Sequence, residues 1–324
     1  MRKKFCKIIV TGGAGFIGSE FVRQAVSQGY QPVVIDKLTY AGDLDRLASV
    51  KGSFTFYKID ICNRSRLDAV LKKEKAFFVV HFAAESHVDR SIMDASPFIE
   101  TNVKGTQILL DVCRVNKIRK FIHISTDEVY GEIKKGEFFE NSPIQPNSPY
   151  AASKAAADLL VQSYIRTYQF PACIARPSNN YGPWQYPEKF IPVAALAALR
   201  DKKIPVYGRG LNVREWLYVG DCAQAIRMIL EKGRLGEAYN IGSGQEVRNI
   251  DMARMILKLS AKPDYLVKFV KDRAGHDFRY SLNVEKISKE LGWRPQVNLE
   301  EGLRETVDWY SGSKYSDEEK NKRP

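Results

Sequence analysis

The 324-residue sequence is poor in the residues that build disulfides and metal centres, with five cysteines and four histidines. The cysteines are odd in number, widely spaced and mostly placed in apolar runs, and no histidine has a recognisable metal partner. This pattern predicts free thiols in a reducing cytoplasm and no bound metal. The residues concerned are Cys6, Cys62, Cys113, Cys173, Cys222, His81, His87, His123 and His276.

Long hydrophobic runs are also missing. A basic start and a brief apolar run imitate a signal peptide, but Gly12 and Gly13 interrupt it early, and no other stretch has the length of a membrane span. The net charge of +12 suits an acidic ligand such as a nucleotide, yet the Lys and Arg residues are scattered instead of forming a block. We therefore expect neither a membrane nor a nucleic acid as a partner.

Short runs rich in β-branched residues alternate with longer helical patterns through the first half of the chain. The runs lie at residues 7–10, 33–35, 54–59, 77–81, 121–124 and 172–175. This alternation is typical of a sheet covered by helices on both faces, so we predict an α/β fold with a Rossmann-type, doubly wound parallel sheet. The start of one helix is well defined, because Ser148 suits the N-cap position and Pro149 the first helical position.

A glycine-rich loop, TGGAGFIG at residues 11–18, follows the first run and opens a helical pattern. Backbone N–H groups in such a loop can hold a pyrophosphate, although a tight turn without a ligand would look the same. The second run ends in Asp36, at the spacing of a carboxylate that accepts the ribose 2′-hydroxyl and repels a 2′-phosphate. We therefore predict a dinucleotide and favour NAD over NADP, although the adjacent Lys37 weakens that choice. Asp60 and Ile61, which close the third run, should flank the adenine.

The pattern becomes irregular after about residue 179, with Pro- and Gly-rich loops at 181–192 and 205–210 and helical patterns at 221–231 and 249–259. We predict a NAD-binding Rossmann domain over residues 1–178. Residues 179–310 should mainly form a smaller C-terminal substrate-binding lobe over the carboxyl edge of the sheet, with the chain free to cross back to the sheet. The polar segment 311–324 is expected to be disordered.

A tyrosine and a lysine spaced four apart, Tyr150 and Lys154, open the best-defined helical pattern. Residues at this spacing face the same way, so the ammonium group can stabilise a phenolate and lower the pKa of the tyrosine. An isolated pair of this kind is more often a buried ring beside a solvated lysine. Downstream of a dinucleotide loop, it predicts a base that takes a proton during hydride transfer.

A hydroxyl and two adjacent carboxylates, Thr126, Asp127 and Glu128, follow the run at 121–124. Open parallel sheets bind their ligands at this edge, although the same residues would also suit an N-cap and a polar turn. Hydride transfer needs only the tyrosine and the lysine. Two further carboxylates therefore indicate a second reaction, most simply the removal of water.

Several longer motifs resemble those of the extended short-chain dehydrogenase/reductase superfamily and, within it, the dTDP-glucose 4,6-dehydratase family. Starting from the glycine loop, the likeness extends to about Tyr280. The motifs lie at residues 36–42 (DKLTYAG), 81–91 (HFAAESHVDRS), 101–106 (TNVKGT), 125–131 (STDEVYG), 179–183 (NNYGP), 187–192 (PEKFIP), 212–216 (NVREW) and 272–277 (DRAGHD). Generic epimerases of the superfamily lack the Asp-Glu pair. Ala151 and Asp43 depart from the usual pattern without disturbing a proposed catalytic group.

The resemblance implies a nucleotide-sugar 4,6-dehydratase that binds NAD tightly. Tyr150, helped by Lys154, would take the proton of the sugar 4-hydroxyl while hydride leaves carbon 4, and Thr126 would hydrogen-bond the same oxygen. Glu128 would then remove the proton on carbon 5, and Asp127 would protonate the departing 6-hydroxyl. Return of the hydride to carbon 6 gives a 4-keto-6-deoxy sugar. An acidic role for Asp127 requires a raised pKa, which burial and the neighbouring carboxylate both favour.

The resemblance also implies ligand contacts, position by position. Cofactor contacts are Gly12, Gly15, Phe16, Ile17, Gly18, Asp36, Lys37, Leu38, Thr39, Asp60, Ile61, Phe82, Ala83, Ala84, Ser86, Thr101, Tyr150, Lys154 and Asn180. The diphosphate should meet Arg214, a suitable guanidinium fork, unless Arg214 forms a surface ion pair with Glu215. The other substrate contacts are Asn249, Arg273 and His276 at the diphosphate, Ser86, Thr126, Asn179, Glu188 and Lys189 around the sugar and nucleoside, and Pro205 and Tyr207 at the base.

Two alternatives stay open. The substrate could instead carry UDP or another nucleotide, since thymine and uracil differ by one methyl group, worth about 1–3 kcal/mol in a pocket. A catalytically silent dinucleotide-binding regulator is a different class, but such a protein could lose Tyr150 or Lys154, and both are present. By analogy, the resemblance also implies a homodimer paired through the helices around residues 96–115 and 151–168.

Overall fold

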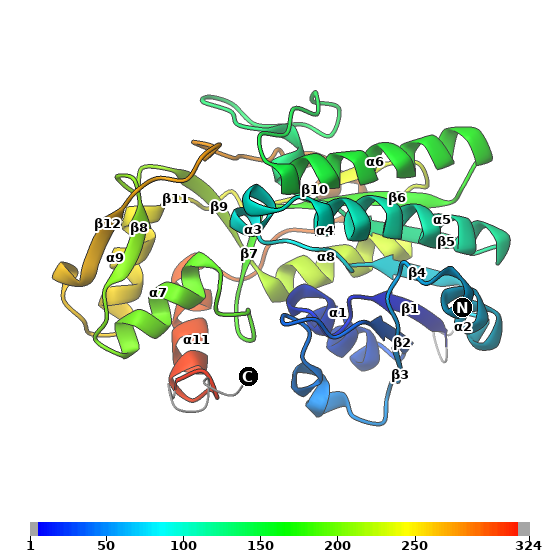
Figure 1. The fold of residues 1–324 in the computed structure, drawn as a ribbon, viewed down its shortest axis with the longest axis horizontal. Coiled ribbons are helices and arrows are strands. Elements are labelled where there is room, and N and C mark those ends of the chain that lie inside the picture. The colour runs from blue at the N-terminus through cyan, green and yellow to red at the C-terminus, as the bar shows by residue number, and fades with distance from the viewer. Residues whose placement is uncertain (1–5, 317–324) are drawn as a thin grey trace.

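A parallel sheet of seven strands forms the centre of the larger domain in the computed structural model, which describes residues 6–316 (Figure 1). The strand order is β10-β6-β5-β4-β1-β2-β3. The strands are β1 (Lys7–Thr11), β2 (Gln31–Asp36), β3 (Thr55–Lys58), β4 (Phe78–His81), β5 (Lys120–Ile124), β6 (Ala172–Pro177) and β10 (Ala238–Ile241). This order, with helical crossovers, confirms the predicted Rossmann-type fold.

Helices cover both faces of the sheet because side chains along each strand alternate between the two faces. Ile8 and Val10 of β1 pack in one hydrophobic core, and Ile9 packs in another. The first core is covered by α1 (Phe16–Ser27), α8 (Val219–Lys232) and α10 (Glu285–Leu291), the second by α2 (Arg64–Glu74), α5 (Thr106–Val115) and α6 (Pro149–Tyr168). With both faces buried, the open carboxyl edge of the sheet is left to carry the polar groups of a site.

Helix α6 begins where its sequence predicts. Ser148 is the N-cap, and its Oγ accepts a hydrogen bond from the backbone N of Ala151 at 3.1 Å, while Pro149 occupies the first helical position. This start fixes the direction in which the next residues of the helix point.

Short helical segments fill the connections after the strands. They are η1 (Leu44–Val50), α3 (Val88–Met93), α4 (Ser96–Phe98), η2 (Ile99–Gly105) and η3 (Asp127–Tyr130). The segment η2 is a π-helix that joins α4 to α5. A π-helical insertion of this kind is often found near a functional site.

A smaller lobe, on the left in Figure 1, lies beyond the carboxyl ends of β4, β5 and β6. Its strands are β7 (Asn179–Tyr181), β9 (Val213–Tyr218) and β11 (Glu246–Arg248) in one sheet, and β8 (Ile204–Tyr207) and β12 (Val267–Val270) in another. Its helices are α7 (Phe190–Leu199), α9 (Asn249–Leu259), η4 (Asp264–Leu266) and α11 (Leu299–Ser311). These elements share a hydrophobic core of their own, which includes Trp216, Ile256 and Leu303.

The segment expected as a lobe helix at 221–231 belongs instead to the sheet. It forms α8, which packs beside α1, and it is followed by β10, the seventh strand. The reason is its apolar face, because Ala223, Ile226 and Ile229 are fully buried in the core between α1 and the sheet. The chain thus crosses back to the sheet after β9.

The polar segment from Ser311 is folded as far as the structure describes it, in contrast to the expected disorder. Tyr315 is buried in the core of the lobe, and Lys314 Nζ lies 2.6 Å from Asp43 Oδ2. Residues 317–324 of the expected tail lie outside the described residues. Within residues 6–316, no helix is both long and apolar enough to cross a bilayer.

Candidate active site

The glycine loop between β1 and α1 leaves a helix N-terminus open. Gly12 has a φ of +69°, and a Cβ at this position would lie 2.5 Å from the backbone N of Ala83. A Cβ on Gly18 would overlap the Gly12 carbonyl. Helix α1 starts after Gly15, and no side chain of the described residues caps its first N–H groups. The loop therefore packs closely, and the uncapped first N–H groups of α1 are left to hold a pyrophosphate.

Asp36 is held in place at the end of β2 by two backbone donors. Its Oδ1 accepts a hydrogen bond from Leu38 N at 2.8 Å, and its Oδ2 accepts one from Ala14 N at 3.0 Å. Burial raises the pKa of this carboxyl, while the two hydrogen bonds act in the opposite direction. A carboxylate has lone pairs for further donors, so Asp36 is available to ribose hydroxyls.

A cavity lies along the carboxyl ends of β1, β2 and β4, where these groups converge. It is lined by Gly12, Gly15, Ile35, Asp36, Lys37, Thr39, Ala41, Gly42, Ile59, Ile61, Phe82, Ala83, Ala84, Glu85 and Thr101. The expected cofactor contacts outside this lining are Phe16, Ile17, Gly18, Leu38, Asp60, Ser86, Tyr150, Lys154 and Asn180. Lining residues that are not among the expected cofactor contacts are Ile35, Ala41, Gly42, Ile59 and Glu85, of which Ala41, Gly42 and Glu85 lie in quoted motifs. These are mostly apolar or glycine, which offers no chemical signal.

Asp60 lies at the border between the cavity and a separate hollow. Its Oδ1 accepts a hydrogen bond from Cys62 N at 2.9 Å, and its Oδ2 lies 3.6 Å from Lys37 Nζ. Lys37 also reaches Glu85, with 3.7 Å between Nζ and Oε1. The Lys37 charge is therefore compensated by carboxylates of the chain, which reduces its attraction for a 2′-phosphate.

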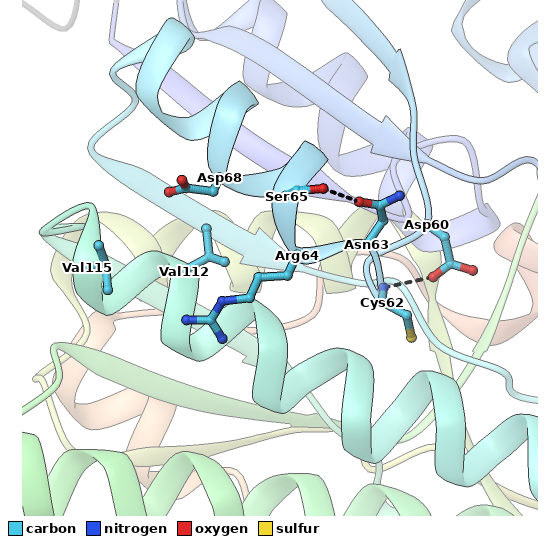
Figure 2. Close-up of a pocket in the computed structure, with 8 residues that line it drawn as sticks. All are labelled: Asp60, Cys62, Asn63, Arg64, Ser65, Asp68, Val112 and Val115. Carbon is cyan, nitrogen blue, oxygen red and sulfur yellow. Dashed lines mark hydrogen bonds between the residues drawn. The ribbon is translucent and has the colours of Figure 1, made fainter.

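The hollow next to Asp60 opens between the first turn of α2 and the end of α5 (Figure 2). Its polar groups satisfy one another locally: Ser65 Oγ donates to Asn63 Oδ1 at 3.1 Å, and Arg64 Nη1 lies 3.0 Å from Asp111 Oδ2. Among the described residues, those that line this hollow contribute no buried polar atom without a partner. The candidate site is therefore the cavity at the strand ends.

Thr126 ends the extended segment after β5 and caps η3. Its Oγ1 accepts a hydrogen bond from Glu128 N at 3.3 Å and donates to Asp127 Oδ1 at 3.1 Å. The N-cap role considered from the sequence is therefore correct. The same hydroxyl is within hydrogen-bonding reach of the Tyr150 phenol, so capping and a place in the site are compatible.

Asp127 is buried with only 1% of its surface exposed. Burial raises the pKa of its carboxyl well above the ordinary value, and the charges of Glu128 and Glu215 act in the same direction. Its Oδ2 has no hydrogen-bond partner among the described residues. Asp127 therefore holds a proton at a pH where an exposed aspartate would be ionised.

Glu128 is partly exposed and faces cationic side chains. Burial raises the pKa of its carboxyl, while the charges of Arg273, Arg214 and Lys189 act to lower it. Two adjacent carboxylates therefore have different surroundings: Asp127 has mainly like-charged neighbours, and Glu128 has cations. Such a difference between two neighbouring carboxyl groups is the pattern that allows one to act as an acid and the other as a base.

Lys154 lies one helical turn after Tyr150, and the end of β5 anchors its charge. Its Nζ donates to the carbonyl oxygen of Ile124 at 2.6 Å. Burial lowers the pKa of this ammonium group to about 8, while Asp158, one further turn along α6, acts to raise it. One hydrogen bond of the Lys154 ammonium group is therefore made to a backbone carbonyl.

Tyr150 is buried, and burial raises the pKa of its phenol. The charges of Glu128 and Asp127 act in the same direction, and the Thr126 hydroxyl is the group that lowers this pKa. The spacing of the tyrosine and lysine predicted an acidified phenol. In the chain without a cofactor the phenol stays protonated, because burial and the nearby carboxylates disfavour the negative charge of a phenolate.

Helix α6 is held in position by two residues for which the sequence predicted no role. Ser91 Oγ accepts a hydrogen bond from Tyr150 N at 3.1 Å. Asn102 Nδ2 donates to Ser153 Oγ at 2.9 Å, and its Oδ1 accepts from Glu85 N at 2.8 Å. Asn102 thus ties the loop after β4 to the helix of the tyrosine. Both residues lie in motifs quoted above, but their types are ordinary for a helix, so no local signal singles them out.

Arg214 is buried with 5% of its surface exposed, and it binds backbone carbonyls. Its Nη2 donates to Asp277 O at 2.9 Å, and its guanidinium lies 4.5 Å from the centre of the Tyr280 ring. Glu215 has different partners, because its carboxylate accepts from the backbone N of Gly244 at 2.8 Å. The arginine is therefore held at the site instead of forming the surface pair that we considered.

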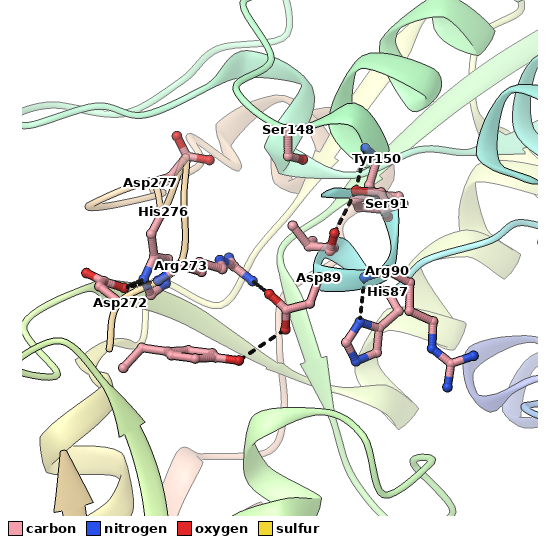
Figure 3. A network of polar contacts seen from close by, with 12 residues as sticks. His87, Asp89, Arg90, Ser91, Ser148, Tyr150, Asp272, Arg273, His276 and Asp277 are labelled. Carbon is pink, nitrogen blue, oxygen red and sulfur yellow. Dashed lines mark hydrogen bonds and ion pairs between the residues drawn. The ribbon is translucent and has the colours of Figure 1, made fainter. Parts of the chain in front are cut away.

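A polar network joins α3 to the lobe (Figure 3). Arg273 Nη1 lies 3.7 Å from Asp89 Oδ1, and Tyr207 Oη donates to Asp89 Oδ2 at 3.3 Å. His276 Nδ1 lies 2.6 Å from Asp272 Oδ1 in the same loop. Three of the expected substrate contacts, Arg273, Tyr207 and His276, are thus brought together from two elements.

A second set of contacts crosses from the loop after β4 to the start of α7. Lys189 Nζ donates to the carbonyl oxygen of Ser86 at 2.6 Å, and Arg90 Nη2 lies 3.4 Å from Glu188 Oε2. Tyr40 Oη also donates to Glu188, at 3.1 Å to Oε1. Three expected substrate contacts, Ser86, Glu188 and Lys189, therefore take part in contacts between the larger domain and the lobe.

Several buried polar atoms near these residues have no hydrogen-bond partner in the part of the chain that the structure describes. They include Asp127 Oδ2, Asn179 Oδ1, Asn180 Oδ1 and Arg273 Nε. Buried polar groups are nearly always satisfied in a working protein, so these atoms are available as hydrogen-bonding partners for a ligand. Of the remaining expected contacts, Asn249 is the first residue of α9, and Pro205 is exposed on β8.

The parallel sheet, the glycine loop at its first strand and the tyrosine–lysine helix define a short-chain dehydrogenase/reductase of the extended type. The sequence model of one family in this class, described as GDP-mannose 4,6 dehydratase, matches residues 9–306, and the chain belongs to this family.

Known relatives agree with this assignment. A dTDP-glucose 4,6-dehydratase from Streptomyces niveus is 48% identical over 312 residues, which cover 94% of this chain and 92% of the relative. The crystal structure of DesIV, a dTDP-glucose 4,6-dehydratase from Streptomyces venezuelae with NAD bound, has a TM-score of 0.94 at 46% identity and covers 97% of this chain and 99% of its own. A UDP-glucose 4-epimerase from Thermus thermophilus, in complex with NAD, has a TM-score of 0.89 at 30% identity, covering 95% and 99%.

Proposed function

We propose that the chain is a dTDP-glucose 4,6-dehydratase that converts dTDP-glucose to dTDP-4-keto-6-deoxyglucose and water with tightly bound NAD. The observation that carries this proposal is the pair of adjacent carboxylates, Asp127 and Glu128, which follow β5 and lie close enough to Tyr150 to raise the pKa of its phenol. An epimerase of the same fold needs only the tyrosine base. Elimination of water needs an acid and a second base, and both are present.

NAD fits the residues at the cavity. The glycines leave no room for a Cβ at Gly12, the first N–H groups of α1 are uncapped within the described residues, and Asp36 has acceptor capacity for a ribose. When bound, NAD supplies the acceptor for the hydride of carbon 4, the donor for carbon 6, and a positive charge near the phenol.

Tyr150 serves as the base for the sugar 4-hydroxyl. Its raised pKa keeps the phenol protonated in the chain alone, so it would first give its proton to solvent. As the phenolate, it would then take the proton of the 4-hydroxyl, with the Thr126 hydroxyl stabilising the oxygen. Lys154, whose pKa lies at about 8, retains a positive charge at neutral pH and supports this exchange.

Glu128 and Asp127 then remove the elements of water. The 4-ketone acidifies the proton on carbon 5, and the Glu128 carboxylate, surrounded by cations, accepts it. The bond between carbon 6 and its oxygen breaks, and the proton held by Asp127 passes to the leaving oxygen to form water. Glu128 can return its proton to carbon 5 when the hydride is added at carbon 6.

The nucleotide diphosphate is expected to bind between the two halves of the molecule, against Arg214, Arg273 and His276. Arg214 and Arg273 offer guanidinium donors, and Arg273 Nε has no partner among the described residues. Tyr207 on β8 is partly exposed and presents a ring for stacking on a base. A single methyl group separates thymine from uracil, so UDP-glucose is the second candidate substrate.

The test is to incubate purified protein separately with dTDP-glucose and UDP-glucose and to follow the alkali-induced absorbance of the 4-keto product. We expect product from dTDP-glucose, with a higher kcat/KM than from UDP-glucose, and none from the Tyr150→Phe variant. A higher kcat/KM for UDP-glucose would instead identify UDP-glucose as the substrate. If no nucleotide sugar gave a product, the alternative of a catalytically silent dinucleotide-binding regulator would be favoured.

We also propose a cytoplasmic homodimer. Supporting this are four apolar side chains along the predicted helices, Ile99, Val115, Leu159 and Tyr168, which are each at least half exposed, and helices α5 and α6 that lie side by side (Figure 1). All five cysteines are free thiols, as a reducing compartment allows. Light scattering on the purified protein should give twice the mass of the chain, and Leu159→Glu should shift it toward the monomer.

A further inference from the structure

Arg46 is a buried cation that the proposed reaction does not use. It lies in η1 with 1% of its surface exposed. Its Nη1 donates to Ala41 O at 2.6 Å and to Ala14 O at 2.9 Å, and its Nε donates to Trp184 O at 3.0 Å. The guanidinium therefore bridges three backbone segments that are far apart in the sequence.

Two of these segments form the wall of the cofactor cavity. Ala14 belongs to the glycine loop, and Ala41 and Gly42 line the cavity. Asp43 N also donates to Ala14 O at 3.0 Å. Arg46 thus holds the loop after β2 against the glycine loop, next to the carboxylate of Asp36.

The third segment belongs to the lobe and has an unusual backbone. Trp184 has a φ of +71°, a conformation that residues other than glycine rarely adopt. Its carbonyl accepts from Arg46, and its ring lies 4.9 Å from that of Trp309 on α11. Such a conformation persists only where several contacts enforce it.

The folded segment 311–316 contacts the start of η1. Lys314 Nζ lies 2.6 Å from Asp43 Oδ2 and 2.7 Å from Asp45 Oδ2, at the start of η1. The ring of Tyr315 is buried, with its centre 6.5 Å from that of Tyr186. Tyr186 in turn meets Tyr40 at 5.3 Å, so aromatic contacts lead from this segment back to the loop after β2.

We propose that Arg46 and the segment 311–316 are positioning elements for the cofactor: they hold the loop 38–43 in its binding conformation and thereby set the affinity for NAD. None of these residues touches the reacting atoms. A loop fixed before binding loses less entropy when the ligand arrives, and the gain appears as affinity. The proposal rests on the assignment of NAD as the cofactor.

The test measures NAD binding to full-length protein from which the cofactor has been removed. Isothermal titration gives the dissociation constant, and thermal unfolding is recorded with and without saturating NAD. Lys314→Ala breaks a partly exposed pair of contacts and should weaken binding about two- to fivefold. Arg46→Lys keeps the charge but cannot reach three carbonyls, so it should weaken binding by about tenfold or more. Lys262→Ala, which breaks a similar pair with Asp201 at the far side of the lobe, is the matched control and should leave NAD affinity unchanged.

The outcome separates a positioning role from a merely structural one. The proposal predicts that NAD raises the Tm of Lys314→Ala and Arg46→Lys by less than it raises the Tm of the wild type. Variants with a lower Tm but wild-type NAD affinity would overturn it, since the segment would then serve stability alone. If Arg46→Lys does not fold, the Lys314→Ala result decides. A wild-type protein that binds no NAD would refute the cofactor assignment itself, and with it the proposal.

Discussion

Two buried carboxylates at the same edge of the sheet have opposite electrostatic surroundings. Burial acts to raise the pKa of Asp158 on α6, but the charge of Arg176, whose Nε lies 2.8 Å from Asp158 Oδ2, overcomes it and holds this pKa below the ordinary value. Asp127 after β5 is buried to the same degree, yet its pKa lies well above the ordinary value. The presence or absence of a cationic partner therefore distinguishes them, and burial does not.

The surroundings of Asp158 form a charge-compensated cluster. Arg176 also donates to Tyr130 Oη at 2.7 Å and to the carbonyl oxygen of Glu140 at 3.0 Å, and His123 Nε2 lies 3.4 Å from Asp158 Oδ1. Burial lowers the pKa of His123 to about 4, so this ring is neutral. A paired, hydrogen-bonded charge of this kind belongs to the framework of the fold.

Asp127 shows the pattern of a functional group instead. Its neighbours Glu128 and Glu215 have like charge, and both add to the rise in its pKa that burial causes. Such a group costs stability and is retained where the reaction needs it. The contrast leads to predictions in which one carboxylate governs turnover and the other governs folding.

The largest expected effect is on turnover. Asp127→Asn removes the acid of the elimination step, and we expect kcat to fall by about 10²–10⁴-fold, the usual contribution of a positioned acid or base. Oxidation at carbon 4 should still occur, because it depends on Tyr150. Single-turnover absorbance of the reduced cofactor, at about 340 nm, measures that step. Full turnover by Asp127→Asn would refute the acid role.

The next effect is on folding. Asp158→Asn leaves the buried guanidinium of Arg176 without its counter-charge, and the free energy of unfolding should fall by about 3–5 kcal/mol. Denaturant titration measures it. The same substitution at Asp251, which forms a partly exposed pair with Arg248 at 2.6 Å, is the control and should cost at most about 1 kcal/mol. Equal losses at the two positions would show that the buried cluster has no special role.

The pH dependence of stability should have opposite signs at the two sites. The pKa of Asp127 is raised in the folded state, so its contribution is full below the unfolded value of about 3.9 and is lost as pH rises through the folded value. Asp127→Asn should therefore stabilise the protein increasingly as the pH rises above ~4. The gain should grow by about 1.4 kcal/mol per pH unit until the pH reaches the pKa of the folded state.

At Asp158 the pKa is lowered, so its contribution is present above about pH 3.9 and is lost as pH falls through the folded value. The advantage of the wild type over Asp158→Asn should thus shrink in acid. Melting temperatures of the two variants and the wild type between about pH 2 and 8 check both signs, since the change at Asp158 falls below about pH 3.9. Parallel curves for the two variants would contradict the comparison.

The sequence predicts the groups of the site better than their surroundings. Strand runs, the glycine loop and the Ser148 cap are local signals, so the sheet and helix α6 were predicted correctly. Asp127 and Asp158 are the same residue type. Their surroundings differ because Asp158 pairs with Arg176, which lies on a different element, strand β6. The folding of Tyr315 depends likewise on aromatic rings from distant elements, which its polar neighbours conceal.

The smallest expected effect concerns the helix that carries both Tyr150 and Asp158. Ser91→Ala removes the acceptor for Tyr150 N, and the loss of one neutral hydrogen bond should lower the free energy of unfolding by about 0.5–1.5 kcal/mol. Because the same bond fixes the first turn of α6, kcat should fall a few-fold while KM for the nucleotide sugar stays unchanged. Ser163→Ala, on the exposed face of α6, is the matched control. If the two serine variants behaved alike, the hydrogen bond at the start of the helix would not be what positions the tyrosine. Its position would then have to depend on the neighbouring carboxylates.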